Sequence, residues 1–499
     1  MKTTWPLLLH LPLRRVFGLL LALALALATA FTTGCGSSSS QSTGLSGNTS
    51  VTVLLTSTAN DQLSLFLIGL NSLALTSQSG KTVNLFTTSQ TTAAYFSGRA
   101  EFIHLNGTAE PLVTVSVPQD VYTSATATMS TTISNPPQFI CVTVGPSGGL
   151  VTSSYAYAEP STPTVNVPAP ITITGRAMGL SLNMVVSQSE TLSGCGVGAT
   201  FSITPVFNLT PVALSPQPTN YENGKETNLD GQISSVNTAS NSFTLVLVDG
   251  QTLSVNSNGS TVYQGVNGFS ALTAGTFVDM DAAIQSDGSQ LATRIAVEDT
   301  DTANLSVATG PVLQTSAAEP IVATFGRQEQ GYLSTIQEAA LLMPYDSGNA
   351  VFQISGQFTN LPDLPFPASF DAANIFGGQN VYITTHALNY IEYMPATTIT
   401  LMPQTINGTV GGASSSGGFQ IYSVALASYD LPPILATQPA QSYTLNNPTN
   451  VMVYVDSNTQ LLNKQPLAQG SVFRFNGLLF NDDGTMRMDC GEVMDGVQP

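Results

Sequence analysis

Hydrophobic and polar residues alternate with a period of two along most of this chain. The alternation is clearest in residues 50–57, 110–117, 171–186, 242–257 and 449–457. Successive side chains of a β-strand point to opposite faces, so this period predicts half-buried strands. The Gly, Asn, Asp and Pro residues that bound the segments predict antiparallel hairpins. We therefore expect an all-β protein.

One segment departs from this pattern. Residues 331–345 read GYLSTIQEAALLMPY, in which Thr335 and Glu338 have the spacing of a capping box and Pro344 would end the run. The sequence predicts a helix here.

The second half of the chain contains an internal repeat. The opening motifs of three modules are Gly231-Gln-Ile, Gly310-Pro-Val and Gly408-Thr-Val, and a later alternating strand in each follows Gly275, Gly378 and Gly470. In the first and third modules this strand runs into an Asp-Gly turn, Asp287-Gly288 and Asp483-Gly484, which is typical of a hairpin. A sheet of five or six short strands hides its edges by closing, so we predict three small antiparallel β-barrels. The middle module matches least well and carries the predicted helix as an insertion.

A polar, Pro-containing stretch without alternation, residues 215–228, is the strongest domain boundary. The predicted organisation is an N-terminal β-domain, a linker and the three modules. Their residues are 51–212, 213–227, 228–304, 305–402 and 403–499.

The first 50 residues have the organisation of an export signal and a tether. Lys2, Arg14 and Arg15 precede an apolar segment at 16–31, which is shorter than the about 20 residues of a membrane-spanning helix. The Ser/Gly-rich residues 36–50 have nothing to bury and should form a flexible tether with ends about 20 Å apart.

The end of the apolar segment, Thr32-Thr33-Gly34-Cys35, resembles the lipobox of bacterial lipoproteins. In that family a peptidase cleaves before a cysteine that carries a diacylglyceryl group, and Leu usually stands where this chain has Thr32. The resemblance implies a signal peptide at 1–34, lipidation of Cys35 and a protein anchored by lipid in the bacterial cell envelope, at the outer membrane. An ordinary cleaved signal or an uncleaved anchor is the alternative, and each of these places the rest of the chain outside the cytoplasm.

Two further resemblances concern the β-domains. The repeat over residues 228–497 resembles a barrel family of unknown function that occurs in tandem in envelope lipoproteins. The strand ending at Thr56, residues 65–75 with the Gly80 turn, and residues 111–129 resemble a second lipoprotein family of unknown function, thought to form a transthyretin-like or immunoglobulin-like β-sandwich. That family has Thr-Asp-Ala-Pro after the first strand, where this chain has Thr-Ser-Thr-Ala from Thr56. We therefore expect a β-sandwich followed by about three barrels.

Charge excludes one class of partner. The formal net charge is −18, and removal of residues 1–34 would take away three of the 12 Lys and Arg residues and none of the 30 Asp and Glu residues, giving −21. Phosphate binding requires a basic face, and the chain has no Lys/Arg cluster. Nucleic acid is not expected as a partner.

The use of the four cysteines is consistent with an exported protein. Cys141 and Cys195 could form a disulfide that closes a loop of about 50 residues, whereas Cys490 is left without a partner and is predicted to be a buried thiol. No Cys-x-x-Cys is present, so zinc-ribbon and thioredoxin-type sites are excluded on spacing.

Motifs for catalysis are sparse. Gly145-Pro-Ser147-Gly-Gly149 matches the G-x-S-x-G pattern, but an alternating, Pro-terminated segment follows it instead of a helix, so we interpret it as a hairpin loop. Only His104 and His386 remain after signal removal, and both lie in alternating segments, as structural histidines do.

Acidic residues give three candidate metal sites. Asp279 and Asp281 share one face of a strand and could hold a hard cation or act as paired carboxylates, but the same positions are Tyr382 and Thr384 in the middle module and Arg474 and Asn476 in the last. A face that accepts all of these is interpreted as the solvent side of a barrel strand. The other two sites are a run in a predicted loop, Glu298, Asp299 and Asp301, and a group formed by Asp482, Asp483 and Asp489. The run is the better Ca²⁺ candidate, although it lacks EF-hand spacing; no other cofactor is expected.

The leading functional hypothesis is a non-enzymatic, lipid-anchored envelope protein whose β-domains serve binding, adhesion or assembly, with the membrane and an envelope protein or polysaccharide as partners. The alternative is an envelope glycan-binding protein, or an enzyme processing glycans or peptides, that uses acidic residues. The mature chain would lack Trp, which disfavours sugar binding, but Tyr155 and Tyr157 share one face of a predicted strand and could stack on a sugar.

Overall fold

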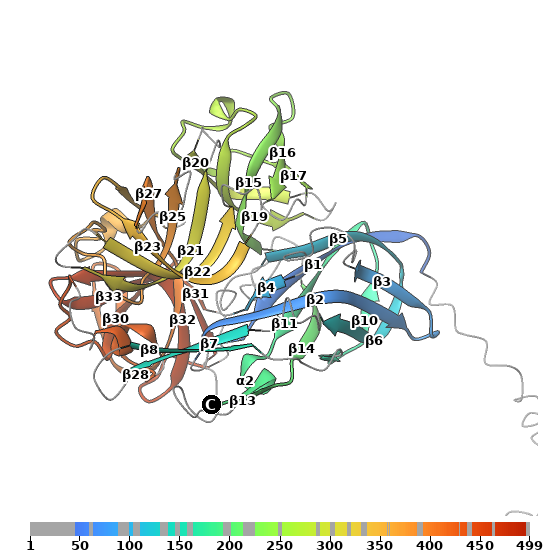
Figure 1. Ribbon diagram of the computed structural model, residues 1–499. Coiled ribbons are helices and arrows are strands. Elements are labelled where there is room, and N and C mark those ends of the chain that lie inside the picture. Colours follow the sequence, from blue (N-terminus) through green and yellow to red (C-terminus); the bar gives the residue numbers. More distant parts are fainter. Residues whose placement is uncertain are drawn as a thin grey trace, which may run out of the picture. The chain divides into compact units, whose positions relative to one another are not determined.

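The computed structural model is nearly all β, with 62% of residues in strands and 5% in helices (Figure 1). This confirms the predicted fold class. The residues that the structure describes are 45–58, 63–87, 99–102, 110–129, 138–144, 150–156, 163–192, 201–212, 225–247, 252–285, 290–299, 305–316, 321–330, 337–356, 358, 360–386, 393–428, 430–436, 442–461 and 465–495.

The N-terminal region contains two main sheets. The first has the order β5-β1-β11-β14-β9, and the second has the order β10-β6-β2-β7-β8 with β3 and β4 also paired to β2. The strands of the first sheet are β1 (Asn48–Ser57), β5 (Glu110–Pro118), β9 (Thr164–Asn166), β11 (Ala177–Met184) and β14 (Val206–Val212). Those of the second are β2 (Leu63–Ser77), β3 (Thr82–Thr87), β4 (Arg99–Glu101), β6 (Asp120–Met129), β7 (Gln138–Val144), β8 (Leu150–Ala156) and β10 (Ile171–Ile173). Short elements α2 (Val186–Ser189), β12 (Glu190–Leu192) and β13 (Phe201–Ile203) complete the region.

One hydrophobic core draws on both of these sheets. Val53 on β1 and Leu182 on β11 belong to the same cluster as Ile68 and Leu70 on β2, and all four side chains have no exposed surface. Because the inward positions of each sheet are apolar, the alternation read from the sequence becomes a shared core.

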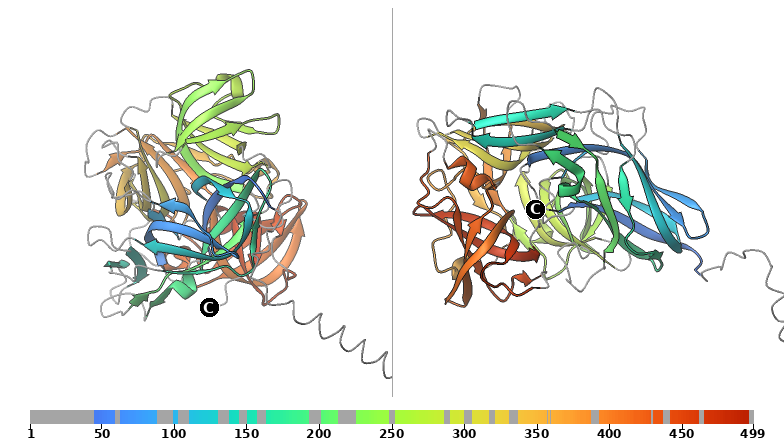
Figure 2. Two further views of the ribbon diagram at one scale, coloured as in Figure 1. Left: turned by 90° about the vertical axis from the view of Figure 1, so that its right-hand side faces the viewer. Right: turned by 90° about the horizontal axis from the view of Figure 1, so that it is seen from below.

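Module 1 is a closed barrel. Its strands are β15 (Lys225–Asn237), β16 (Ser242–Leu247), β17 (Thr252–Asn256), β18 (Val262–Gln264), β19 (Phe277–Ile284) and β20 (Gln290–Asp299), with the 3₁₀ turn η1 (Phe269–Ala271). The order is β17-β16-β15-β19-β20-β18, and a further pairing of β17 with β20 closes the sheet. Figure 2 shows its curved yellow-green strands from two further directions.

Module 3 repeats this topology. Its strands are β28 (Gln404–Ser416), β29 (Phe419–Leu426), β30 (Asn450–Val455), β31 (Gln460–Leu461), β32 (Val472–Asp482) and β33 (Thr485–Asp495), with the short helix α3 (Leu431–Leu435). The order is β30-β29-β28-β32-β33-β31, and β30 pairs with β33. The two predicted barrels therefore share one strand order and one closing contact.

Module 2 is a variant of the same sheet. Its elements are β21 (Ser306–Thr315), β22 (Ile321–Gln330), β23 (Gln337–Asp346), β24 (Val351–Ile354), η2 (Leu361–Asp363), β25 (Asn380–Thr385), β26 (Met394–Pro395) and β27 (Thr398–Met402). The order is β24-β27-β25-β21-β22-β23-β26, so within the described residues β23 pairs with β22 and β26 instead of closing on β27.

The helix predicted over 331–345 is wrong where the structure describes it. Gln337–Asp346 is strand β23, which runs antiparallel to β22, with Thr324 opposite Met343 and Val322 opposite Tyr345. Helix propensity differs by only a few tenths of a kcal/mol among residues such as Glu, Ala and Leu, and pairing along a whole strand outweighs it. Residues 331–336 lie outside the described residues.

The repeat glycines occupy equivalent places in all three modules. Gly231 lies opposite Val278, Gly310 opposite Val381 and Gly408 opposite Phe473 in the paired strands. The later glycines, Gly275, Gly378 and Gly470, all have positive φ, of 93°, 98° and 87°. A Cβ atom at Gly231 or Gly408 would lie only 2.4 Å from an atom of the adjacent strand. Glycine is therefore required both for the turn and for the close approach of strands where each sheet bends.

Turn chemistry also follows the sequence. Asp483 and Gly484 join β32 to β33 with φ of 48° and 83°, the left-handed pair that an Asp-Gly hairpin uses. The G-x-S-x-G motif at 145–149 lies outside the described residues, but Val144 on β7 pairs with Leu150 on β8, as predicted for a hairpin.

Candidate functional site

The predicted solvent face of the barrel strand β19 is buried. Asp279 and Asp281 are only 2% and 3% exposed, so the interpretation of these positions as a wet surface is wrong. Phe277, on the same face, packs with Tyr382 and Met402 of module 2 in a separate cluster, while Val278 belongs to the core of module 1. The outer side of this barrel strand is therefore an internal surface, because residues distant in sequence pack against it.

Arg294 on β20 neutralises part of the buried acidic charge. Its Nε donates to Asp281 Oδ2 at 2.8 Å and its Nη2 donates to Asp279 Oδ2 at 2.5 Å. Burial raises the pKa of Asp279, although Arg294 opposes this change. Burial acts to lower the pKa of Arg294, but the two carboxylates outweigh it and raise that pKa. Both carboxylates bind the same guanidinium, so these three residues form a buried ion cluster and not a solvent-exposed cation-binding site.

The equivalent positions of module 2 are uncharged. Tyr382 and Thr384 on β25 are 1% and 0% exposed, and the Thr384 hydroxyl lies 2.7 Å from that of Thr398 on β27. The same location on the fold therefore holds hydroxyl groups where module 1 holds ions.

Module 3 reverses the charges. Arg474 and Asn476 on β32 stand where module 1 has Asp279 and Asp281, and Glu492 on β33 lies opposite Asn476 as Arg294 lies opposite Asp281. Both hairpins have a register shift directly after these positions, at Asn476/Gly477 and Asp281/Ala282. Asn476 and Glu492 are 7% and 4% exposed.

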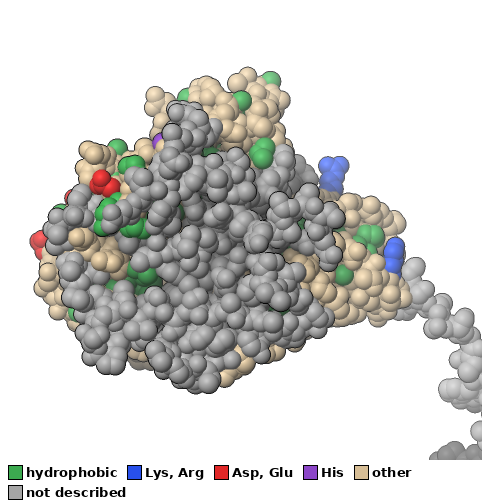
Figure 3. Space-filling view, viewed as in Figure 1, with side chains coloured by type: hydrophobic (Ala, Val, Ile, Leu, Met, Phe, Trp, Pro, Cys, Tyr) green, Lys and Arg blue, Asp and Glu red, His purple; other side chains and the backbone are tan. Residues whose placement is uncertain are grey.

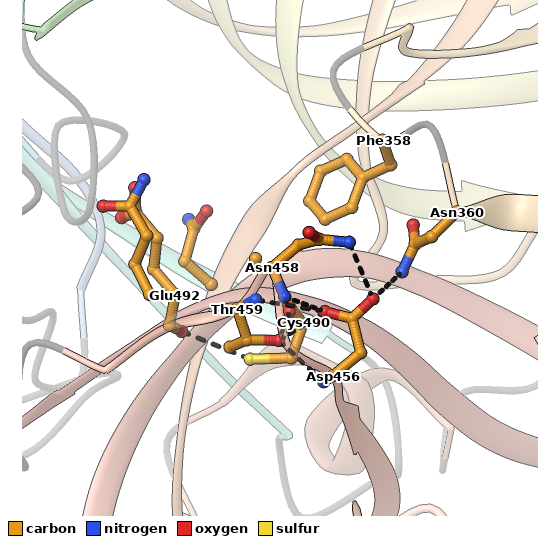
Figure 4. A pocket seen from close by; sticks show the side chains of 10 residues that line it. Phe358, Asn360, Asp456, Asn458, Thr459, Cys490 and Glu492 are labelled. Carbon is orange, nitrogen blue, oxygen red and sulfur yellow. Dashed lines mark hydrogen bonds between the residues drawn. The ribbon is translucent and has the colours of Figure 1, made fainter. Parts of the chain in front are cut away.

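A polar cavity of about 180 Å³ lies beside these module 3 residues (Figure 4). Phe358 and Asn360, from the segment after β24 of module 2, form one side of it. The module 3 side chains that line it are Asp456, Asn458, Thr459, Gln460, Asn476, Cys490 and Glu492. None of the residues lining this cavity is Lys, Arg or His, so its hydrogen-bonding groups are carboxylates, carboxamides and a threonine hydroxyl.

A compact turn between β30 and β31 positions Asp456. Its Oδ1 accepts from the backbone N–H of Asn458 at 2.8 Å and of Thr459 at 3.0 Å. The Thr459 hydroxyl donates to the carbonyl of Cys490 at 2.7 Å and so ties the turn to β33. These bonds fix the turn beside the cavity, and Figure 4 shows its residues Asp456, Asn458 and Thr459 together.

Module 1 contains the same turn without the cavity residues. The Thr261 hydroxyl donates to the carbonyl of Ala292 at 2.8 Å, and Asn258 Oδ1 accepts from the N–H of Ser260 at 2.8 Å. Asn258 and Thr261 therefore do what Asp456 and Thr459 do in module 3, which makes the turn part of the barrel framework.

Asn360 links two carboxylates, of which Asp456 lines the cavity and Asp489 does not. Its Nδ2 donates to Asp456 Oδ2 at 3.2 Å and to Asp489 Oδ1 at 3.0 Å. Asp489 has no exposed surface, and burial raises its pKa to about 6, with Asn360 opposing and Asp456 adding to the change. Cys490 is a buried free thiol, as predicted, and burial raises its pKa as well.

Most residues proposed from sequence as sites are not brought together here. Glu298 and Asp299 lie at the end of strand β20 instead of in a loop, and Asp301 is outside the described residues. Asp482 pairs with Arg487 at 2.7 Å near the hairpin end, while buried Asp489 lies opposite Leu478 farther along the strands. Among the described residues no group of three His, Cys, Asp or Glu side chains could hold a metal ion.

Several other predictions fall on residues that are not described. Cys35, Cys195 and His104 lie outside the described residues, as does Tyr157, and Cys141 and Tyr155 lie in β7 and β8 without a described side chain. His386 follows β25 and is half-buried. The cavity residues Phe358, Asn360 and Gln460 were missed. The one available signal was the match of Asp456-Ser-Asn-Thr459 to Asn258-Gly-Ser-Thr261.

The described surface and helices point to no further functional site. On the face in Figure 3 the described surface is mostly uncharged polar side chains and backbone, with few acidic or basic groups. Within the described part of the chain, no helix is both long and apolar enough to cross a membrane.

Comparisons with known proteins support only a coarse assignment. Residues 230–296 match the family described as "Domain of unknown function (DUF5666)". No curated protein matches the chain. A solved structure of a family 32 glycoside hydrolase from Bifidobacterium adolescentis is 12% identical and covers 89% of this chain and 67% of its own, with a TM-score of 0.11. A score this low carries no argument about fold or function.

Proposed function

We propose that this protein is a non-enzymatic, lipid-anchored protein of the bacterial cell envelope that displays β-domains for binding. The observation that carries the proposal is Cys35, between an apolar segment at 16–31 and the Ser/Gly-rich residues 36–50. A diacylglyceryl group on this cysteine would hold the folded region at the outer membrane, and the tether would keep it clear of the lipid surface. The sequence of residues 65–75 and 111–129 resembles a lipoprotein family of unknown function, which agrees with this location.

The packing of the barrels supports a binding role over catalysis. The interior of module 1 is filled by side chains such as Ile233, Leu245 and Ile295, each with no exposed surface. Module 3 is filled in the same way, with Phe475 and Val453 fully buried. A filled barrel leaves no internal cleft for a substrate, so recognition by these modules would take place on their outer faces.

Lipid labelling in a bacterial host tests the anchor. The full chain should incorporate radiolabelled palmitate and sediment with membranes, and Cys35→Ser should abolish both. Ser37→Ala, two residues away, should retain both and serves as the matched control. Membrane retention of Cys35→Ser without label would overturn lipid anchoring, because the apolar segment itself would then be the anchor.

One observation favours a second candidate, an envelope glycan-processing enzyme. Asp456 and Asp489 both accept hydrogen bonds from the Asn360 amide, and the pKa of Asp489 is raised to about 6, as the pKa of a general acid would be. Asp489 does not line the cavity, however, so it would have to act through Asp456. Release of reducing sugar ends from isolated envelope polysaccharide, lost in Asp456→Asn, would establish this alternative.

A further inference from the structure

The barrel fold alone does not explain the cavity of module 3, because module 1 holds an ion cluster at the corresponding positions. Module 1 has the same strand order, the same turn and the same register, but Arg294 extends over the positions that correspond to the cavity wall and binds Asp279 and Asp281. In module 3 the residue equivalent to Arg294 is Glu492, which lines open space. At the position where module 1 has this central cation, module 3 therefore has an acid that lines the polar cavity.

Asp456, an acidic side chain that lines the cavity, already accepts hydrogen bonds from N–H donors at both of its oxygens. Asp456 Oδ1 accepts two backbone N–H groups, and its Oδ2 accepts from the side-chain amides of Asn360 and Asn458, both at 3.2 Å. Oxygens committed to four N–H donors are poor ligands for a hard cation, which needs several carboxylate or carbonyl oxygens at once. The cavity therefore offers hydrogen bonds in fixed directions instead of an ion cage.

The remaining lining groups combine planar amides and the Glu492 carboxylate with an aromatic face. The backbone of Gln460 pairs with Glu492, but its side-chain amide has no hydrogen-bond partner among the described residues, so this amide can both donate to and accept from a ligand. The Phe358 ring lies against Gly491, where an added Cβ would be 3.1 Å from the ring Cζ atom. An apolar ring face beside directed amide and carboxylate groups matches a ring compound with C–H groups on its face and hydroxyl groups at its edge.

We infer that the module 3 cavity, between Phe358 and the turn that carries Asp456, is a binding site for a single uncharged, hydroxyl-bearing ring such as one sugar residue or a cyclic polyol. The cavity of about 180 Å³ is smaller than sites for drug-sized ligands, which supports one ring and not a chain buried along its length. The inference rests on the proposed binding function and names its ligand class. A hexose of about 12 non-hydrogen atoms in such a site is expected to bind with a Kd of about 1–10 mM.

Ligand-observed NMR on the full chain purified in detergent tests this site. The probes are glucose, galactose, N-acetylglucosamine and myo-inositol, each titrated to about 50 mM. We expect saturable binding of at least one probe, weakened at least about tenfold by Gln460→Ala, which removes the amide, and by Gly491→Ala, whose methyl group displaces the Phe358 ring. Gln314→Ala, at an exposed position of β21, is the matched control and should bind as the unmodified chain does.

Three outcomes would overturn the inference. They are no saturable binding of any probe, binding that both cavity variants leave unchanged, and variant-sensitive binding of Ca²⁺ or tetramethylammonium chloride in place of the neutral probes. Thermal unfolding of each variant shows whether it is folded, and Gln460→Ala decides the outcome if Gly491→Ala is not. Because purified protein needs no anchor to bind a sugar, failure here is separable from failure of the lipid-labelling experiment.

Discussion

Modules 1 and 3 are two versions of one barrel whose side chains differ in charge at one place on the outer side of the barrel. They share the strand order, the closing pair, the register of their glycines and a turn fixed by Thr261 or Thr459. At the paired outer positions, however, module 1 has two acids and a base, whereas module 3 has a base, an amide and an acid.

This difference separates what the fold requires from what it permits. Gly231 and Gly408 are fixed because a Cβ atom would collide with the neighbouring strand. Asp281 and Asn476 are free to differ because their side chains leave the barrel and meet whatever packs outside. The outer face can therefore become a buried contact in one module and a polar cavity in another without any change to the barrel.

The largest effect should come from breaking the ion cluster of module 1. Arg294→Met leaves Asp279 and Asp281 buried without their cation, and loss of one partner from a buried cluster costs about 3–5 kcal/mol. Urea unfolding combined with hydrogen exchange of β19 and β20 measures this loss. The equivalent change in module 3, Glu492→Gln, should cost less than half as much, because Arg474 beside it is half-exposed and can be solvated.

A compensating variant sharpens this test. Replacing the whole cluster, by Asp279→Asn, Asp281→Asn and Arg294→Met together, removes all three charges and should recover most of the stability. If Arg294→Met unfolds at the same urea concentration as the unmodified chain, the cluster does not hold module 1 together.

A smaller, pH-dependent effect is expected in module 3. Asp430, before α3, is 3% exposed and accepts from the backbone N–H and side-chain amide of Asn407 at 3.0 and 3.2 Å. Burial raises its pKa from an ordinary 3.8 to about 7, with the Asn407 and Ala427 hydrogen bonds opposing the change. The folded state then holds a proton that the unfolded state has lost, so stability falls as pH rises from about 4 to about 7.

This effect should amount to about 2.5 kcal/mol between pH 5 and 8. Asp430→Asn should flatten that part of the stability profile, as measured by urea unfolding of module 3 strands followed by hydrogen exchange. Asp489, with its pKa raised to about 6, acts in the same direction and would leave a residual slope. A profile that rises with pH in the unmodified chain would contradict the prediction.

The smallest effect tests what the two modules share. Thr261→Val and Thr459→Val each remove one hydroxyl that donates to a strand carbonyl, at 2.8 and 2.7 Å. Each should cost about 1 kcal/mol, and the two losses should be equal within error, because the turns are the same. A clearly larger loss for Thr459→Val would mean that the turn of module 3 supports the cavity in addition to the barrel.

The barrels could be predicted from sequence because their signals are local. Alternation gives strands, and Gly231 with Gly275 marks the two places where the sheet must bend or turn, so the repeat of these glycines predicts the repeat of the fold. The helix over 331–345 was mispredicted because the partner of β23 is another strand, and pairing between strands is not visible in the composition of either one.

The candidate site could not be predicted for the same reason. The sequence predicts a solvent-facing position for Asp279 and Asp281, because the residues that pack on this face of β19, such as Tyr382 against Phe277, come from a different module. The cavity joins Phe358 with Gln460, which are far apart in the chain and belong to no motif. Only the turn at Asp456 could be recognised in the sequence, by its similarity to the turn at Asn258. That similarity predicts a structural turn of the barrel and says nothing about a ligand.

The pairing of β17 with β20, and of β30 with β33, has a consequence for crowded surroundings. An open sheet presents a row of free N–H and C=O groups along its last strand, and a neighbouring molecule can extend the ladder there. The five strands of each ring are paired on both sides, and only the short strands β18 and β31 lie beside it, so two copies of module 1 or module 3 that collide have no long free edge at which to extend the ladder. Closure thus lets these modules be concentrated on one surface while each remains a separate folded unit.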